Sequence, residues 1–333
     1  MERIPTQCRA VDELLDGGLA TGTITQIFGE KALGKSIFSH QAACSTVVAG
    51  HSAVILDTEQ SYGSYLLPYR QEGMNKRFGR EIAAIELKPV RITKPSGKRK
   101  GATRGELLTA MGTTLDRLGV SYTNAQMGSM ADILCPSLTV EVPTKDPSVF
   151  IMQTPEVVDL LNLHGVDASK EVSNGGRVEL RLRQTPAYDS ILRSIIRETG
   201  ARLLVYDSIS APFKSSFPST QDLPARSAGL AMVLSHAQRL CVEFGIAVLV
   251  VSHVSIDPIK AWNRHPYGGV ILGHEAKFSL ELTKSTARRN GEAEAENPDE
   301  MSDKGRAFWI ARHPAMEEYS RFGFATIDQE GFH

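Results

Sequence analysis

The sequence has almost no net charge and no long hydrophobic run, and each absence excludes a class of protein. Lysine and arginine number 37 against 38 aspartates and glutamates, so the formal net charge is -1 over 333 residues. A whole-molecule attraction to nucleic acid or an anionic membrane is therefore excluded, and any such binding has to be local. No apolar run reaches the roughly 18 residues of a membrane span, and the N-terminus lacks the apolar core of a signal peptide. We expect a cytoplasmic protein without a membrane contact.

Cysteines are also few, and they are too widely separated to suggest a shared site. They are Cys8, Cys44, Cys135 and Cys241, and no two form a C-x-x-C pair. This spacing suggests neither a zinc site nor a disulfide framework. With 41% hydrophobic and 23% charged residues, the composition is that of a globular chain. Its length suits one large α/β domain with an insertion, or two ordinary domains.

Two stretches of the chain alternate between the patterns of a buried strand and a helix. An apolar β-branched run at 21–29 is followed by helical spacing at 35–50 and a second apolar run at 52–59. The alternation returns later, with strands and helices expected at 176–184, 187–200, 201–208, 228–245 and 246–254. Apolar strands separated by single helices predict an α/β fold with a mostly parallel central sheet flanked by helices. Strand patterns near the C-terminus predict β-hairpins at 277–285, 306–314 and 321–331.

Residues 89–175 interrupt this alternation. We expect them to form an insertion of unknown role between two parts of one core, 1–88 and 176–333. The insertion begins with a basic stretch, because seven of the 17 residues at 88–104 are lysine or arginine. That stretch suggests either added phosphate contacts or a solvated loop. A strand followed by a helix is predicted at 148–165.

Residues 28–36, FGEKALGKS, match G-x-x-x-x-G-K-[ST] between a predicted strand and a predicted helix. The glycines let successive backbone N–H groups face inward, where they and the positive helix end bind phosphates. Lys35 is expected to be solvent-accessible and to reach the β- and γ-phosphates, while the Ser36 hydroxyl ligates Mg²⁺. The predicted ATP-binding residues are Gly29, Glu30, Lys31, Ala32, Leu33, Gly34, Lys35, Ser36 and Ile37. The alternative is a tight turn with an exposed lysine.

Carboxylates suited to nucleotide chemistry lie at two further strand ends. Asp207 ends the run at 201–208, which is the expected setting of an acid that holds Mg²⁺ through water. Its alternative role is to cap the element that follows. Asp57 and Glu59, two residues apart, are expected to face the same side of their strand. We predict that Glu59 is the catalytic base that deprotonates the attacking water, with Lys35 as the catalytic cation, and that Asp57 is a solvated strand end.

Together these residues resemble the RecA/RadA recombinase superfamily, and within it the archaeal RadB-like paralogues. The resemblance begins at PTQCRAVDELLDGGLATGTITQIFGEKALGKS and continues through ILDTEQSY, LLVYDSIS and VLVVSHVSIDP. It ends with YGGVILGHEAKFSLELTK and GFATIDQEGF. The resemblance implies a RecA-like P-loop ATPase core that uses ATP and Mg²⁺. It also implies DNA, a RadA-type recombinase or other repair proteins, and further copies of the chain as partners.

The sequence departs from the family pattern at three places. It starts a few residues before the ATPase core, where full recombinases have an N-terminal domain, and this favours a RadB-like paralogue. Ser252 and His253 stand where the family has an Asn-Gln pair that senses the γ-phosphate. A histidine can also donate to a phosphate, so we include His253 among the ATP-binding residues; a structural histidine at a strand end is the alternative. Residues 89–175 have no counterpart in the pattern.

The resemblance places two DNA-contacting loops at 209–226 and 254–267. The second loop combines cations with aromatic rings, the combination used on single strands, and its candidate DNA-binding residues are Lys260, Trp262, Arg264 and Tyr267. The first loop is poorer, and offers Lys214, Arg226 and the rings of Phe213 or Phe217. Either loop can instead contact a neighbouring protomer.

The predicted function is that of an ATP-binding, weakly hydrolysing recombinase paralogue that binds DNA and assists homologous recombination and repair. One alternative is a KaiC-like regulatory module, in which ATP switches protein partners without DNA. A second alternative is a P-loop kinase acting on a small molecule. A salt-dependent interaction with single-stranded DNA in the presence of ATP and Mg²⁺ separates the first two.

Overall fold

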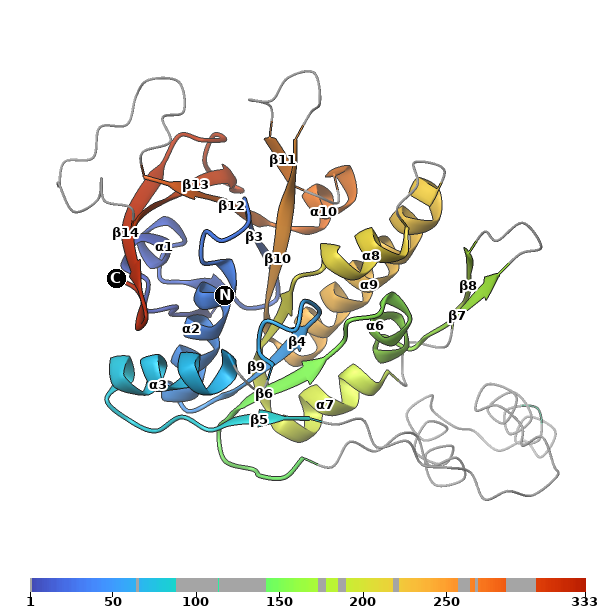
Figure 1. The fold of residues 1–333 in the computed structure, drawn as a ribbon, viewed down its shortest axis with the longest axis horizontal. Helices are drawn as coiled ribbons and strands as arrows, with labels where there is room; N and C mark the ends of the chain where they lie inside the picture. The colour runs from blue at the N-terminus through green and yellow to red at the C-terminus, as the bar shows by residue number, and fades with distance from the viewer. Residues whose placement is uncertain are drawn as a thin grey trace.

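The chain forms an α/β structure around one large sheet (Figure 1). The computed structural model describes residues 2–63, 66–87, 113, 142–172, 178–184, 190–217, 222–256, 264–266, 269–285 and 304–333. The strands are β1 (Arg3–Ile4), β2 (Leu19–Ala20), β3 (Ile24–Gly29), β4 (Ser52–Asp57), β5 (Ala84–Glu86), β6 (Val149–Gln153), β7 (Val166–Val172), β8 (Val178–Gln184), β9 (Ala201–Asp207), β10 (Ala247–Ile256), β11 (Arg264–Pro266), β12 (Phe278–Lys284), β13 (Gly305–Arg312), β14 (Phe322–Asp328) and β15 (Gly331–Phe332). The helices are α1 (Arg9–Leu14), α2 (Lys35–Val48), α3 (Leu66–Phe78), α6 (Val157–Leu163), α7 (Ile191–Thr199), α8 (Ser210–Ser216), α9 (Leu223–Phe244) and α10 (Gly269–Glu275).

The central sheet is mostly parallel, as the sequence predicts. Among the described residues it has 11 strands in the order β15-β14-β13-β12-β3-β10-β9-β4-β6-β5, with β11 paired to β10. The pairs from β12 through β5 are all parallel. Strands β12 to β15 pair antiparallel, which confirms the C-terminal hairpins.

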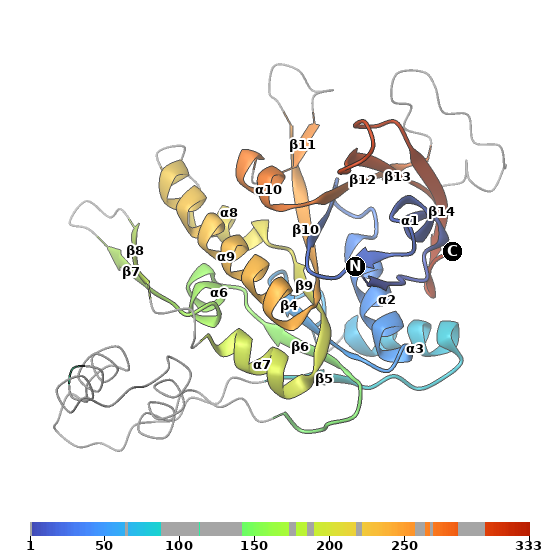
Figure 2. The same cartoon turned by 180° about the vertical axis from the view of Figure 1, so that it is seen from behind.

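Helices cover both faces of this sheet, so the core has two layers. Helices α1, α2 and α3 bury apolar side chains against one face. Helices α6 to α10 bury theirs against the other. Figures 1 and 2 show the two groups on opposite sides of the strands. Because both faces are covered, the inner strands β3, β4 and β9 are buried along almost their whole length. None of the helices in the described ranges is long and apolar enough to cross a membrane.

Of two strands whose place the sequence leaves to be tested, β6 belongs to the central sheet and β8 does not. Strand β6, within the segment predicted as an insertion, is almost wholly buried and pairs with β4 in the central sheet; α6 follows it, as predicted. Strand β8 was expected to continue the core alternation, but it pairs with β7 in a separate two-stranded sheet. In β8 every second residue is charged, whereas a strand inside a parallel sheet has to bury both faces. The extent of the inserted domain stays a prediction.

Candidate nucleotide-binding site

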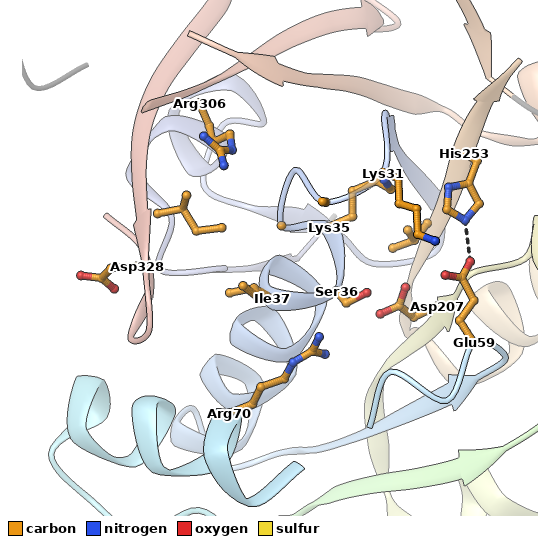
Figure 3. A pocket seen from close by; sticks show the side chains of 14 residues that line it. Lys31, Lys35, Ser36, Ile37, Glu59, Arg70, Asp207, His253, Arg306 and Asp328 are labelled. Atoms are coloured by element: carbon orange, nitrogen blue, oxygen red, sulfur yellow. Dashed lines mark hydrogen bonds and ion pairs between the residues drawn. The ribbon is translucent and has the colours of Figure 1, made fainter. Parts of the chain in front are cut away.

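The predicted site residues meet where parallel strands of the central sheet end. Strand β3 ends at Gly29, β4 at Asp57 and β9 at Asp207, and His253 lies on β10 beside Gly29. Asp207, His253 and residues that follow the other strand ends line a cavity of about 390 Å³, at a place where open α/β sheets bind ligands (Figure 3). Its lining residues are Lys31, Ala32, Gly34, Lys35, Ser36, Ile37, Glu59, Arg70, Asp207, Val251, His253, Arg306, Ile327 and Asp328.

The phosphate loop needs glycine at both of its defining positions. Gly34 has a left-handed backbone (φ 103°) immediately before α2. A Cβ atom there would collide with the side chain of Ile327. Gly29 lies against β12, where a Cβ atom would collide with the carbonyl oxygen of Leu282. These glycines let the loop turn tightly while the N-terminal end of α2 faces the cavity.

Lys35 is buried, so the expectation that it is solvent-accessible is wrong. Only 7% of its surface is exposed. Its Nζ donates to the carbonyl oxygens of Gly29 (3.0 Å) and Glu30 (2.5 Å), and so closes the loop on itself. Burial lowers the pKa of Lys35, and the charges of Asp207, Glu59 and Glu30 oppose that change. The ammonium is thus held at the cavity wall by neutral acceptors that an anion can replace.

Asp207 lies beside Ser36 at the bottom of the cavity, as a shared metal-binding role requires. The Tyr62 hydroxyl donates to Asp207 Oδ2 (3.1 Å) and lies 2.9 Å from the Ser36 carbonyl oxygen. Burial raises the pKa of Asp207 to about 6; a hydrogen bond from Ser36 lowers it, and the charges of Asp57 and Glu59 raise it further. The surroundings of Asp207 therefore do not supply enough positive charge to offset its burial and the neighbouring carboxylates.

Glu59 is held by hydrogen bonds from His253 on β10 and from Ser208, which directly follows β9. Its Oε1 accepts from His253 Nε2 (2.6 Å) and from the Ser208 hydroxyl (2.6 Å). The hydrogen bond from His253 is the main cause that lowers the pKa of Glu59 to about 2, against the effect of burial. His253, expected to bind phosphate, is thus engaged with the predicted base, and the dashed line in Figure 3 marks this pair.

Asp57 does not share a role or a direction with Glu59. It is fully buried, which corrects the expectation of a solvated strand end. Its carboxylate accepts backbone N–H groups of Glu59, Ser61 and Tyr62, at 3.3, 2.9 and 2.9 Å. The two side chains diverge because β4 ends at Asp57, so the period-two rule for a strand does not reach Glu59. Asp57 shapes the turn that presents Glu59 to the cavity.

These side chains suit a nucleotide and Mg²⁺. The left-handed Gly34, the buried Lys35 and the start of α2 form a cradle for phosphate. Ser36 and Asp207 offer the oxygen ligands that Mg²⁺ prefers. In the described part of the chain, no group of three or more His, Cys, Asp or Glu side chains could hold a metal ion alone. Mg²⁺ at nucleotide sites needs only one or two protein ligands, because phosphates and water complete its shell.

Comparison with known proteins identifies the family. A family model described as Rad51 matches residues 1–79 and 177–312, more than half of the chain. The chain belongs to the Rad51 family. This confirms the resemblance to the RecA/RadA superfamily. The unmatched residues between the two parts include β5 to β7 and α6.

Relatives of this Rad51-family chain are named for DNA repair and recombination. DNA repair and recombination protein RadB of Halobacterium salinarum is 48% identical over 56 residues, 17% of this chain and 24% of RadB. DNA repair and recombination protein RadA of Haloquadratum walsbyi is 25% identical over 283 residues, 83% of this chain and 65% of RadA. The human meiotic recombination protein DMC1/LIM15 homolog is 32% identical over 107 residues, 30% of this chain and 32% of that protein. The chain therefore spans less than two thirds of each of these relatives.

Several residues in or beside the cavity of this Rad51-family chain are not singled out by the sequence. Arg306, on β13, donates through Nε to the Leu33 carbonyl oxygen (3.1 Å) and so supports the phosphate loop. Tyr62 and Ser208 hold the two carboxylates, and Arg70 reaches the cavity from α3. No local pattern singles out such residues, because each belongs to an element brought to the loop only by folding.

The predicted DNA loops are described only in part. Lys260, Trp262 and Tyr267 lie outside the described residues, and Arg264 begins β11. Strand β10 pairs with β3 as far as His253 and beyond that with β11, so the two form a hairpin that extends past the sheet (Figure 1). In the first loop, Phe213 and Phe217 are buried in the core, so the expectation that they offer stacking surface is wrong. Lys214 is exposed on α8.

Proposed function

We propose that this chain binds ATP with Mg²⁺ in the phosphate-loop cavity, hydrolyses it slowly, and assists homologous recombination and DNA repair by binding DNA. The observation that carries the proposal is the meeting of Lys35, Ser36, Asp207 and Glu59 in one cavity of a Rad51-family chain. The names of the RadB and RadA relatives support the assignment to DNA repair and recombination.

Each group in the cavity has a role in this proposal. The backbone N–H groups of residues 29–37 and the ammonium of Lys35 hold the phosphates. The Ser36 hydroxyl and Asp207 hold Mg²⁺, Asp207 through water. Bound Mg²⁺ supplies positive charge to the phosphate oxygens. Lys35 Nζ would exchange the Gly29 and Glu30 carbonyls for phosphate oxygens, because a charged acceptor is stronger than a neutral one.

Glu59 acts as the base that orients and deprotonates the attacking water. Its Oε1 carries both hydrogen bonds, and among the described residues none is bonded to Oε2, which can therefore hold the water. A carboxylate with a pKa of about 2 is ionised at neutral pH, but it is a weak base. The hydrogen bond from His253 weakens Glu59 as a base, so we expect slow hydrolysis while the two side chains stay paired. Released from Glu59, His253 can donate to a phosphate.

The proposed DNA contact adjoins the nucleotide site through β10. This strand carries His253 and continues directly into the 254–267 segment, whose basic and aromatic residues suit single-stranded DNA. Binding of a nucleotide and binding of DNA would thus both involve residues of β10 or of the segment that continues it. We further infer a cytoplasmic protein, with further copies of the chain and a RadA-type recombinase or other repair proteins as partners.

The test of the nucleotide site compares Lys35→Ala with Lys76→Ala. Lys76 is an exposed lysine whose ion pair with Glu330 lies on α3 and the C-terminal turn, outside the cavity lining. Titration with a non-hydrolysable ATP analogue and Mg²⁺ should show that Lys35→Ala lowers the binding affinity by at least about 100-fold. This loss is expected because the substitution removes a charged phosphate contact and also the hydrogen bonds by which Lys35 supports the loop. Lys76→Ala should bind as the parent does. Equal binding by all three proteins would contradict the proposal. Melting temperatures are needed too, because Lys35 also closes its own loop.

A further inference from the structure

Arg70 is a cation in the phosphate-loop cavity without a polar partner among the described residues. It lines the cavity from α3. Its Nη1 atom is buried and forms no hydrogen bond there. The guanidinium instead lies over the ring of Tyr62, with 5.2 Å between Cζ and the ring centroid. A buried N–H group without an acceptor costs about 1 to 3 kcal/mol, so this arrangement calls for an acceptor.

Two other arginines near the site show what a satisfied guanidinium looks like in this fold. Arg77, also on α3, donates to the carbonyl oxygens of Gln7 (2.6 Å) and Phe332 (2.7 Å). Arg306 donates to Leu33 (3.1 Å) and Gly305 (2.8 Å). Both tie chain segments together, whereas Arg70 ties none within the part of the chain that the structure describes. Its position is explained by a ligand better than by the packing of the chain.

The place of Arg70 shows which part of a nucleotide it would meet. Figure 3 shows its guanidinium directed from α3 toward Ser36. Tyr62 connects the two, because its ring contacts Arg70 and its hydroxyl contacts the Ser36 carbonyl oxygen and Asp207. The side chain of Tyr62 therefore lies between the guanidinium and the residues assigned to Mg²⁺ and phosphate. None of the cavity carboxylates, Glu59, Asp207 and Asp328, forms an ion pair with it in the described part of the chain.

We propose that Arg70 binds phosphate oxygens of the nucleotide, as a second cation supplied by α3 and independent of the phosphate loop. This inference rests on the proposed binding of ATP. A guanidinium is always charged, and it offers a planar pair of donors that matches two phosphate oxygens. Stacking on Tyr62 holds that plane at the cavity wall before ligand arrives, which reduces the entropy lost on binding. Nucleotide binding would thereby fix α3 to the phosphate loop.

The experiment measures affinity for a non-hydrolysable ATP analogue with Mg²⁺ over a series of KCl concentrations. The variants are Arg70→Gln, Arg70→Lys and, as the matched control, Arg80→Gln. Arg80 is an exposed arginine just beyond the same helix, outside the cavity. Arg70→Gln should bind roughly tenfold more weakly, with a flatter dependence on salt, because one charge contact is lost. Arg70→Lys should keep the salt dependence of the parent but bind more weakly than the parent, because an ammonium keeps the charge and lacks the planar pair of donors. Arg80→Gln should match the parent.

Each contrary result has a distinct meaning. No binding by the parent protein would overturn the proposed function itself. A parent that binds, with Arg70→Gln unchanged in affinity and salt dependence, would overturn only the Arg70 contact. Equal losses in Arg70→Gln and Arg70→Lys without a change in salt dependence would overturn it too, and would indicate stacking on the base or support of Tyr62. Melting temperatures monitor folding. If Arg70→Gln fails to fold, Arg70→Met, which keeps the apolar stem over Tyr62, takes its place in the same comparison.

Discussion

Glu59 illustrates how this fold sets the chemistry of one side chain through residues remote in sequence. Ser208 directly follows β9 and His253 lies on β10, and both donate to Oε1 of Glu59. The carboxylate of Asp57 accepts hydrogen bonds from the backbone N–H groups of Glu59 and Ser61, and so fixes the backbone at Glu59. The carboxylate of Glu59 therefore points into the cavity, keeps its charge and is restrained as a base. A glutamate two residues after a strand would otherwise be an ordinary solvated side chain.

Glu59→Gln tests the proposed base. The amide keeps the shape of the side chain and can still accept the hydrogen bond from Ser208, but it cannot take a proton from water. Affinity for the ATP analogue should stay within a few-fold of the parent value. The rate of ATP hydrolysis should fall by about 100-fold or more, which release of phosphate measures. An unchanged rate would assign the base to another residue.

At the scale of elements, a buried chain of polar side chains fastens α6 to the core. His164, at the end of α6, lies 2.8 Å from His236 on α9 (Nδ1 to Nδ1) and 3.1 Å from the Tyr206 hydroxyl on β9 (Nε2 to the hydroxyl). All three side chains are buried. Burial, and then the neighbouring His236, hold the pKa of His164 well below its usual range. Since an Nδ1-to-Nδ1 hydrogen bond needs one donor and one acceptor, protonation of both rings would break it.

This chain predicts a dependence of stability on pH. His164 stays neutral in the folded state but takes up a proton in the unfolded state below about pH 6.5, so it contributes less stability as the pH falls below that value. The difference in free energy of unfolding between the parent and His164→Gln should shrink by up to about 1.4 kcal/mol per pH unit below pH 6.5. Urea denaturation between pH 7.5 and 5 measures it. Parallel profiles for the two proteins would mean that His164 is charged when folded.

At the scale of the whole molecule, the nucleotide cavity and the proposed DNA contact lie along one strand. Strand β10 is held between β3 and β9 up to the cavity, and beyond it pairs only with β11 in the described residues. The two functions can therefore be separated by substitution. Changes beyond β10 should spare the sheet, whereas changes at the strand ends should affect both binding and stability.

Trp262→Ala and Lys260→Ala test the DNA contact, with Lys76→Ala on α3 as the control. Loss of a stacked ring should weaken single-stranded DNA binding by about 1 to 3 kcal/mol. Lys260→Ala should weaken it and flatten its salt dependence. Binding of the ATP analogue and the melting temperature should stay near the parent values, and Lys76→Ala should leave all four quantities nearly unchanged. If the parent binds no DNA, or the Trp262 and Lys260 variants bind it equally well, a nucleotide-switched module for protein partners becomes the better description.

The sequence was sufficient for the elements whose signals are local. The phosphate loop, the strand at 201–208 that ends in Asp207, and the helix that ends at Gly200 were predicted because each depends on residues within one short segment. Strand β8 was placed wrongly, since a strand pattern does not name its partner. Lys35 was expected in solvent because its motif gives its chemistry but not the carbonyls that surround it.

By itself, the sequence determined the α/β class, the phosphate loop and the acids that end two strands, because backbone conformation and hydrophobic period act over a few residues. Only the tertiary structure decided which groups these residues meet: His253 on Glu59, Tyr62 between Ser36 and Asp207, and Arg306 behind Leu33. Those contacts join strands and helices up to about 270 residues apart, and their energies depend on the exclusion of water from a shared space. No short segment contains that space.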